Sequence, residues 1–203
     1  MTIRSGWPDR DVQTRFESSL EHSASLFFFG FFDNLSRGLE LDLAKLAIKA
    51  IAHDLHEILT TDRNPAQVYS KGRTRAQIRR FWERARERVK DWRDWETLFF
   101  AEEKRAMWKL TRPLSRKVRN VLREAWVEYY EGKTREDRYL REIHPLVGAS
   151  WGLFCREQPG NEGMASLNSF FAEGDQIITD LYLRKLLLEV QEKVRKAFGA
   201  KNN

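Results

Sequence analysis

The chain has 203 residues, of which 41% are hydrophobic and 33% are charged, and its formal net charge is +6. This is the size of one ordinary domain and the composition of a soluble globular protein, which argues against general disorder and against a membrane protein. The densest apolar stretch, residues 26–32, is far shorter than the roughly 20 residues that span a bilayer, and no signal peptide is visible. A single cysteine, Cys155, excludes an internal disulfide and agrees with a reducing compartment, so we expect a cytoplasmic protein without a membrane partner.

Apolar residues in nearly every long segment recur with the period of a helix, and no segment alternates convincingly as a strand would. The predicted helices cover residues 15–33, 40–60, 73–95, 97–110, 113–132, 136–157, 164–172 and 175–198. Asn64-Pro65 closes the second of these, and Pro159-Gly160 separates the C-terminal part. We therefore predict an all-α fold, a single domain over residues 1–203 with a helical extension at 164–203.

The pair His53-Asp54 lies late in the second predicted helix. A histidine and a carboxylate side by side can ligate one metal ion, and Glu57, one turn further on, can reach a water on that ion. A histidine on an apolar helix face is more often a packed structural residue. A buried glutamate beside it, however, needs a charge partner, because a lone buried carboxylate is costly, and a metal ion supplies one.

Further motifs surround this pair in a recognisable order. They are Trp7-Pro8, Val12-Gln13-Thr14, Glu21-His22-Ser23 and Thr61-Asp62. The order resembles that of the HD-domain metal-dependent phosphohydrolases, and within them the bacterial 5'-deoxynucleotidase branch, which includes phage dATP-degrading enzymes. The likeness is close over residues 7–71 and returns around residues 126–157.

The resemblance implies an HD-domain helical bundle with a bound divalent metal ion, either Mn, Co, Zn or Mg. The implied ligands are His22, His53 and Asp54, and the position of the family's last ligand corresponds to His144. The family has an aspartate at that last position. Histidine is an acceptable ligand, but it replaces an anion by a neutral donor and leaves the metal more positive.

The resemblance also implies roles in catalysis and substrate binding. Glu57 would orient or deprotonate the attacking water, and Asp62 would lie near the sugar or the leaving oxygen, although it could equally be a turn residue. Trp7 would stack on the nucleoside. The candidate phosphate contacts are Arg4, Arg10 and Lys71. We predict that His56, the fourth histidine, is a supporting or surface residue.

The interval between the two halves of the motif is longer than in the family, and we place an inserted helical segment at about residues 91–116. This aromatic segment could cover the substrate mouth or form a subunit contact. The preceding run, residues 71–93, is basic with interleaved tryptophans. Its opposite charges at helical spacing favour a solvated, ion-paired face over a nucleic-acid site.

The sequence thus predicts a cytoplasmic HD-type nucleotide phosphohydrolase that acts on deoxynucleotides, either on a 5'-monophosphate or on a triphosphate. The alternative is a degenerate HD fold that binds nucleotide or nucleic acid without hydrolysing it. Such a protein could also work as part of a larger assembly. Nucleic acid ranks below a deoxynucleotide as the ligand. Because related enzymes are commonly dimeric, a homodimer is the candidate assembly.

Overall fold

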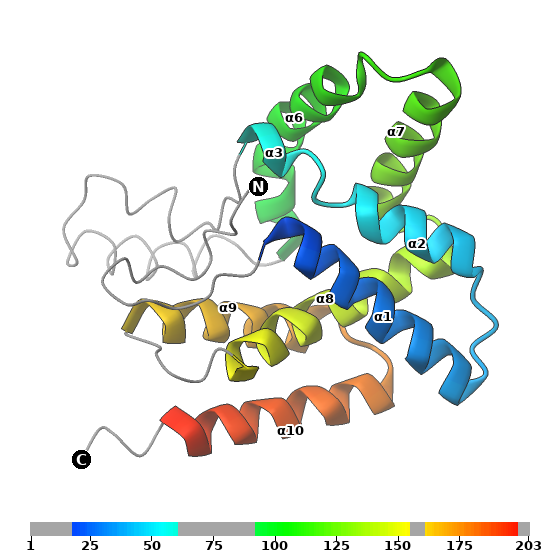
Figure 1. Cartoon of the computed structure of the whole chain (residues 1–203). Coiled ribbons are helices and arrows are strands. Elements are labelled where there is room, and N and C mark those ends of the chain that lie inside the picture. Colours follow the sequence, from blue (N-terminus) through cyan, green and yellow to red (C-terminus); the bar gives the residue numbers. More distant parts are fainter. Residues whose placement is uncertain (1–17, 61–91, 155–160, 199–203) are drawn as a thin grey trace.

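The computed structural model describes residues 18–60, 92–154 and 161–198. The elements in these ranges are helices (Figure 1): α1 (Ser19–Arg37), α2 (Leu43–Ala52), α3 (Glu57–Thr60), α6 (Trp92–Thr111), α7 (Arg116–Glu131), α8 (Arg135–Phe154), α9 (Asn161–Ile177) and α10 (Leu181–Phe198). The all-α prediction is confirmed for this part of the chain. No helix within it is long and apolar enough to cross a membrane. The helix predicted at 73–95 lies largely outside the described residues.

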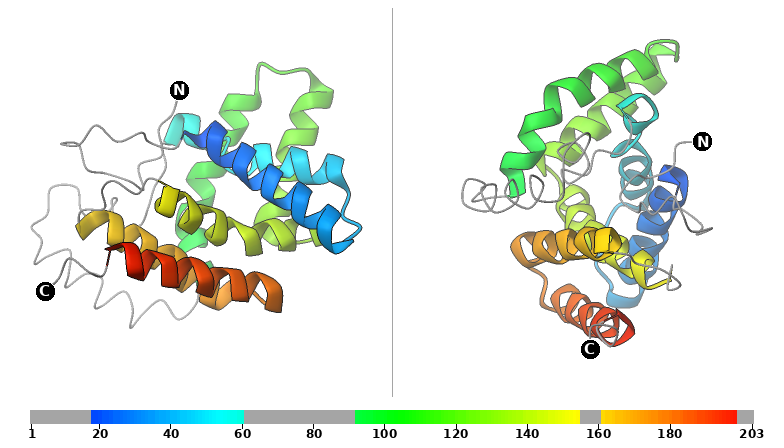
Figure 2. Two further views of the ribbon diagram at one scale, coloured as in Figure 1. Left: turned by 60° about the horizontal axis from the view of Figure 1, so that its bottom comes forward. Right: turned by 90° about the vertical axis from the view of Figure 1, so that its left-hand side faces the viewer.

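Helix α8 is the centre of the bundle. It packs against α1, α2, α7, α9 and α10, and Figure 2 shows it between the α1–α2 pair and the α9–α10 pair. The main core contains Leu26, Leu46, Leu140 and Ile143, all fully buried. A second, smaller core around Trp126 joins α2, α6 and α7. The predicted insertion at 91–116 is thus largely the helix α6, which packs on α3 and α7; whether it is inserted relative to the family stays a prediction.

Capping interactions set the ends of α1, which lies about four residues later than predicted. At its start, the Glu21 N–H donates to Ser18 Oγ, and the Ser18 N–H donates to the Glu21 carboxylate. At its end, Gly38 adopts φ +61°, a left-handed conformation that glycine accepts without strain. The reciprocal cap begins the helix just before His22, so this histidine lies in the first turns of α1.

The second predicted helix, 40–60, is not continuous, and this prediction was wrong. Helix α2 ends at Ala52, residues 53–56 form a turn, and α3 begins at Glu57. The His53 ring contacts the Ala50 carbonyl at this end of α2. Hydrogen bonds from Leu55 N–H to Ala52 O and from Glu57 N–H to Asp54 O then tighten the chain.

The break between the last two helices also lies later than predicted. Helix α9 continues to Ile177, and α10 begins after Asp180. The Asp180 carboxylate accepts hydrogen bonds from the N–H groups of Tyr182 and Leu183, as an N-cap does. A capping aspartate, rather than the apolar pattern, therefore sets this boundary.

Helices α8 and α9 approach each other closely at Gly148. A Cβ atom at this position would lie 2.6 Å from the Phe170 ring, closer than packed atoms allow. Gly148 is one turn after His144, so the tight contact lies on the helix face that carries this histidine. The packing at Gly148 therefore fixes which part of α9 faces His144.

Helices α1, α8 and α10 are joined by a polar network. The Tyr139 hydroxyl donates to Asp33 Oδ2 at 2.8 Å, and Arg37 donates to both Asp33 and Asp180. Burial and the neighbouring Asp33 carboxylate raise the pKa of the Tyr139 phenol, which keeps it protonated and able to donate. The network holds the C-terminal helix against the two helices that carry His22 and His144.

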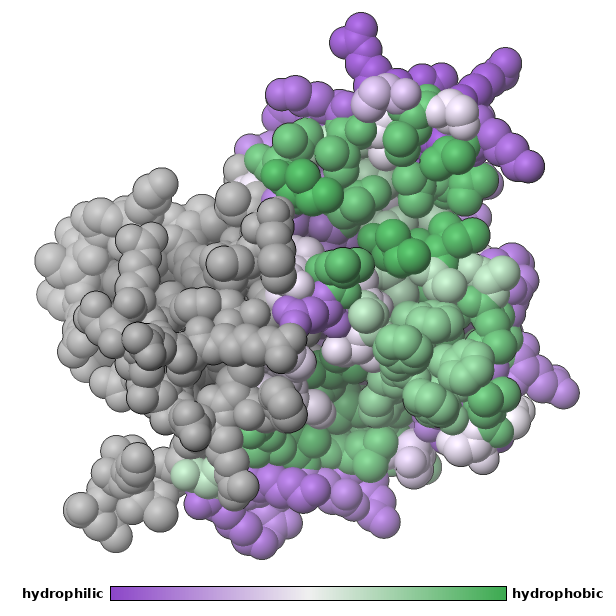
Figure 3. Space-filling view, in the orientation of Figure 1, coloured by the Kyte–Doolittle hydropathy of each residue, from purple (hydrophilic) through white to green (hydrophobic). Residues whose placement is uncertain are grey.

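Apolar side chains also gather on the outer face that Figure 3 shows, over α1, α2 and α7. On α1 the exposed ones include Phe28, Phe32 and Leu35, at 54%, 64% and 60% exposure. Contiguous apolar surface of this kind is typical of interaction sites. The homodimer stays a prediction, because nothing in the described residues identifies the partner that covers this face.

A buried ion pair joins α2 to α7 and α8. Lys49, only 2% exposed, donates to Asp137 Oδ1 at 2.5 Å, to Glu128 Oε2 at 2.7 Å and to Thr134 Oγ1 at 3.0 Å. Asp137 also accepts hydrogen bonds from the backbone and the hydroxyl of Thr134 at the start of α8. The lysine thus ties α2 to the first turn of α8.

Removing the lysine should leave a buried carboxylate without its cation, so we expect Lys49→Ala to lower the free energy of unfolding by about 3 to 5 kcal/mol. Lys45→Ala, at an exposed position of the same helix, is the control and should change it by less than about 0.5 kcal/mol. Urea denaturation measures both. Equal, small effects would show that the ion pair does not hold the helices together.

Candidate metal centre

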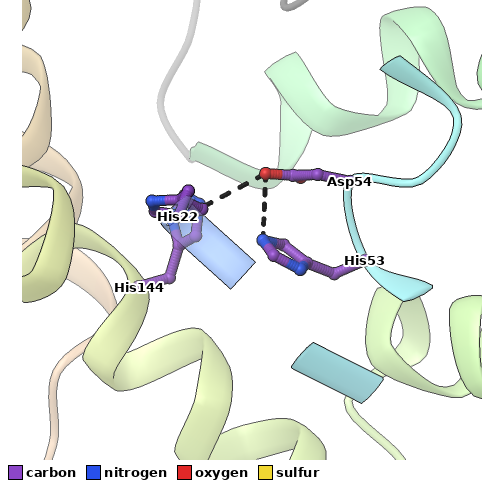
Figure 4. Close-up of side chains that lie close together, drawn as sticks. All are labelled: His22, His53, Asp54 and His144. Carbon is purple, nitrogen blue, oxygen red and sulfur yellow. Dashed lines mark ion pairs between the residues drawn. The ribbon is translucent and has the colours of Figure 1, made fainter. Parts of the chain in front are cut away.

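The four predicted ligands lie side by side (Figure 4). His22 comes from α1, His53 from the end of α2, Asp54 from the following turn and His144 from α8. One ligand atom from each lies within 4.8 Å of all the others. Segments far apart in the sequence therefore meet at one point, and they bring three imidazoles and one carboxylate together.

The spacing suits a single ion. His53 Nε2 is 3.0 Å and His22 Nε2 is 4.0 Å from Asp54 Oδ2, and the ring centroid of His144 is 5.0 Å from that of His22. Two donors bound to one zinc ion at about 2.1 Å lie at most about 4.2 Å apart. Small side-chain rotations would therefore bring all four donors into the coordination sphere of one ion, and the residues present fit a divalent metal.

The orientation of His53 also favours a cation at this point. Its Nδ1 lies 2.8 Å from the Ala50 carbonyl oxygen, and because a carbonyl only accepts, Nδ1 carries the proton. Nε2 then faces the Asp54 carboxylate at 3.0 Å. A nitrogen lone pair and a carboxylate oxygen repel each other unless a proton or a metal ion lies between them. A backbone carbonyl that fixes the ring in this way is typical of metal-binding histidines.

Burial of the site is uneven. His22 and His53 are 0% and 2% exposed, whereas the side chains of Asp54 and His144 retain 13% and 15% of their exposure. The Tyr129 ring packs beside His53, with ring centroids 5.3 Å apart. The exposed edge of the cluster is therefore the side of Asp54 and His144.

The acidic residues nearest to His144 on α8 have other partners. Asp137 binds Lys49, and Glu142 accepts hydrogen bonds from Thr179 Oγ1 at 2.6 Å and from the Asp180 N–H at 3.2 Å. Of these three residues of α8, His144 is the one that lies in the cluster with His22, His53 and Asp54. The structure therefore brings the residue expected from the sequence, and not a neighbouring acid, to the other three.

Glu57 lies beside the cluster and not within it. It is the first residue of α3, is 5% exposed, and its Oε2 accepts a hydrogen bond from Ser19 Oγ at 3.0 Å. Ser19 precedes His22 by one turn of α1, so this bond holds the carboxylate next to the histidine-bearing turn. The position is compatible with the predicted role on a water.

His56 is not a surface residue, and that part of its prediction was wrong. It is 7% exposed, its Nδ1 lies 3.3 Å from Trp126 Nε1, and its Nε2 lies 3.7 Å from Glu103. The tryptophan N–H only donates, so His56 accepts at Nδ1. The residue anchors the turn after the ligand pair to α6 and α7.

Sequence reasoning missed Glu173. This residue of α9 is 6% exposed, and its Oε1 lies 3.5 Å from His144 Nδ1. One signal could have found it, because the acid lies one turn from Phe170 and one turn from Ile177, apolar residues that pack against the core. An acid on such a face needs a partner.

The predicted substrate residues Arg4, Trp7, Arg10 and Lys71, and the predicted catalytic residue Asp62, lie outside the described residues. Their roles stay predictions.

A family model described as HD domain matches residues 1–92. This stretch contains His22, His53, Asp54 and Glu57, whereas His144 lies beyond it. No curated protein is significantly similar to the chain. The match supports a relationship of this stretch to the HD-domain superfamily, whose members are generally metal-dependent phosphohydrolases. It supports the superfamily and not the 5'-deoxynucleotidase branch.

If the cluster holds one ion, His53→Ala should abolish metal binding, measured as metal per chain by elemental analysis. The wild type should gain stability with added metal, by about 2.7 kcal/mol at 100 times the Kd, and the variant should gain none. His56→Gln is the matched control, because it perturbs the same turn without removing a ligand, and it should keep the metal. Unchanged stoichiometry in His53→Ala would disprove the site.

Proposed function

We propose that the protein is a divalent-metal-dependent phosphohydrolase that acts on deoxynucleotides. The observation that carries the proposal is the gathering of four donor atoms within 4.8 Å beside the buried carboxylate of Glu57, in a chain whose first 92 residues match the HD domain. The branch and the substrate class rest on the resemblance of the motifs around Trp7, His22 and His53.

The donor set favours some of the candidate metals over others. Three imidazoles and one carboxylate suit zinc and cobalt better than magnesium, which prefers oxygen ligands. We therefore expect zinc or cobalt to bind most tightly, then manganese, and magnesium least.

The chain's own residues divide the work of hydrolysis. A bound divalent ion would polarise a phosphate oxygen and lower the pKa of a water that it holds. The carboxylate of Glu57 would accept the proton of the attacking water, and the Ser19 hydroxyl fixes its orientation by donating to Oε2. His22, His53, Asp54 and His144 would serve as ligands.

The charge of the chain suits this substrate class, because a net charge of +6 attracts an anionic nucleotide. On the substrate side, Trp7 would stack on the base, Asp62 would contact the sugar or the leaving oxygen, and Arg4, Arg10 and Lys71 would contact phosphate. Stacking on a base is worth about 1 to 3 kcal/mol and tolerates different bases.

A direct test incubates the purified protein with each deoxynucleoside 5'-monophosphate and triphosphate, in zinc, cobalt, manganese and magnesium, and measures release of phosphate or triphosphate. Hydrolysis of at least one substrate supports the proposal. A protein that binds metal and nucleotide but hydrolyses none would instead be a binding module. The neutral His144, in the place of a carboxylate, is the observation in favour of that second candidate.

In the active protein, Glu57→Ala should lower kcat by about 10² to 10⁴, the usual share of general acid–base catalysis, while metal per chain stays unchanged. Glu103→Gln is the matched control. It alters a carboxylate that contacts His56, in the turn just before Glu57. If the role of Glu57 is specific, this control should keep near-normal turnover. Near-normal turnover in Glu57→Ala itself would contradict the assignment.

A further inference from the structure

The carboxylate of Glu173 lies against the one site histidine that replaces an aspartate. Its Oε1 is 3.5 Å from His144 Nδ1, and the residue is 6% exposed. Within the described part of the chain, His144 is the polar partner that the structure gives to this carboxylate. A buried carboxylate is costly without a donor or a cation, so the contact to His144 is what makes Glu173 acceptable at this position.

The contact also decides which nitrogen of His144 can ligate. An imidazole whose Nδ1–H points at a carboxylate keeps Nε2 as its donor nitrogen and becomes a stronger base. His53 uses its Nδ1 in the same manner, with the Ala50 carbonyl as acceptor. A separation of 3.5 Å is slightly long for a hydrogen bond, and a small rotation of either side chain would close it.

The packing of α9 on α8 fixes the pair. Phe170 lies one turn before Glu173, and its ring fills the space beside Gly148, one turn after His144. The centroids of the Phe170 and His144 rings are 6.4 Å apart. The tight contact of the two helices therefore presents Glu173 to His144.

The charges of the ligands also favour a carboxylate beside His144. Three neutral imidazoles and one carboxylate carry a charge of −1, one less than a set that ends in an aspartate. The Glu173 carboxylate restores the missing charge, because it lies against the imidazole of His144 instead of binding the metal itself. We propose that Glu173 is a positioning residue of the metal centre: it orients His144 and, with it, replaces the aspartate that the family has at this last ligand position. This inference rests on the proposed metal-dependent function.

The first test measures the Kd of the apoprotein for zinc and for cobalt by competition with a chromogenic chelator. Glu173→Gln should weaken binding by about 10- to 100-fold, the usual effect of losing a carboxylate behind a ligating histidine, and should shift the visible absorption of the bound cobalt. Glu142→Gln is the matched control on α8, because its carboxylate binds Thr179 and not the cluster. Its Kd should stay within about twofold of the wild type.

A double-mutant cycle adds a test that loss of folding cannot mimic. His144→Asp in the wild-type background places a second carboxylate against Glu173, so it should lose affinity by mutual repulsion. In the Glu173→Gln background the same substitution meets a neutral amide and should cost clearly less affinity. Effects that simply add would overturn the pairing of the two residues.

Glu173→Asp is the second variant, in case Glu173→Gln does not fold. It keeps the charge at a greater distance and should lose less affinity than the amide, and an equal or larger loss would overturn the charge argument. Metal binding by Glu173→Gln within twofold of the wild type overturns the role of Glu173 and leaves the proposed function standing. A wild type that binds no divalent ion overturns the metal centre and, with it, this inference.

Discussion

The buried ion pair of Lys49 and Asp137 is the interaction on which the geometry of the site depends. Lys49 lies one turn before His53, and Asp137 lies two turns before His144, so each partner shares a helix face with a ligand. The pair therefore sets both the distance and the register between α2 and α8. A shift of either helix by one residue would separate the ligands as well as the charges, and the low exposure of both partners makes such a shift costly.

The break in the helix after Ala52 lies beside the ligand pair. His53, the C-cap residue of α2, keeps helical dihedral angles (φ −56°, ψ −44°), and its Nε2 lies 3.0 Å from Asp54 Oδ2. Residues 53–56 form a turn, and the next helix begins at Glu57. The contact of the His53 ring with the Ala50 carbonyl orients the imidazole at this end of α2.

The sequence was sufficient where the information is local or tied to a motif. Helical periodicity predicted the all-α fold, and the resemblance predicted the four residues that the structure brings together. It was insufficient where tertiary packing sets the structure. Residues 53–56 contain no glycine or proline that would predict a turn, and the burial of His56 depends on Trp126 from another helix. Glu173 escaped for the same reason, because only the packing of α9 on α8 puts its carboxylate beside His144.

The distribution of the site over the chain has a consequence for biosynthesis. His22, His53 and Asp54 leave the ribosome well before α8 and α9, so the nascent chain first presents two imidazoles and one carboxylate without the helix that closes the site. A long-range contact of this kind forms late, since the intervening chain must be ordered first. If the cluster holds a metal ion, stable loading therefore belongs to the end of synthesis, when the C-terminal helices have docked, and a truncated chain would lack the complete ligand set.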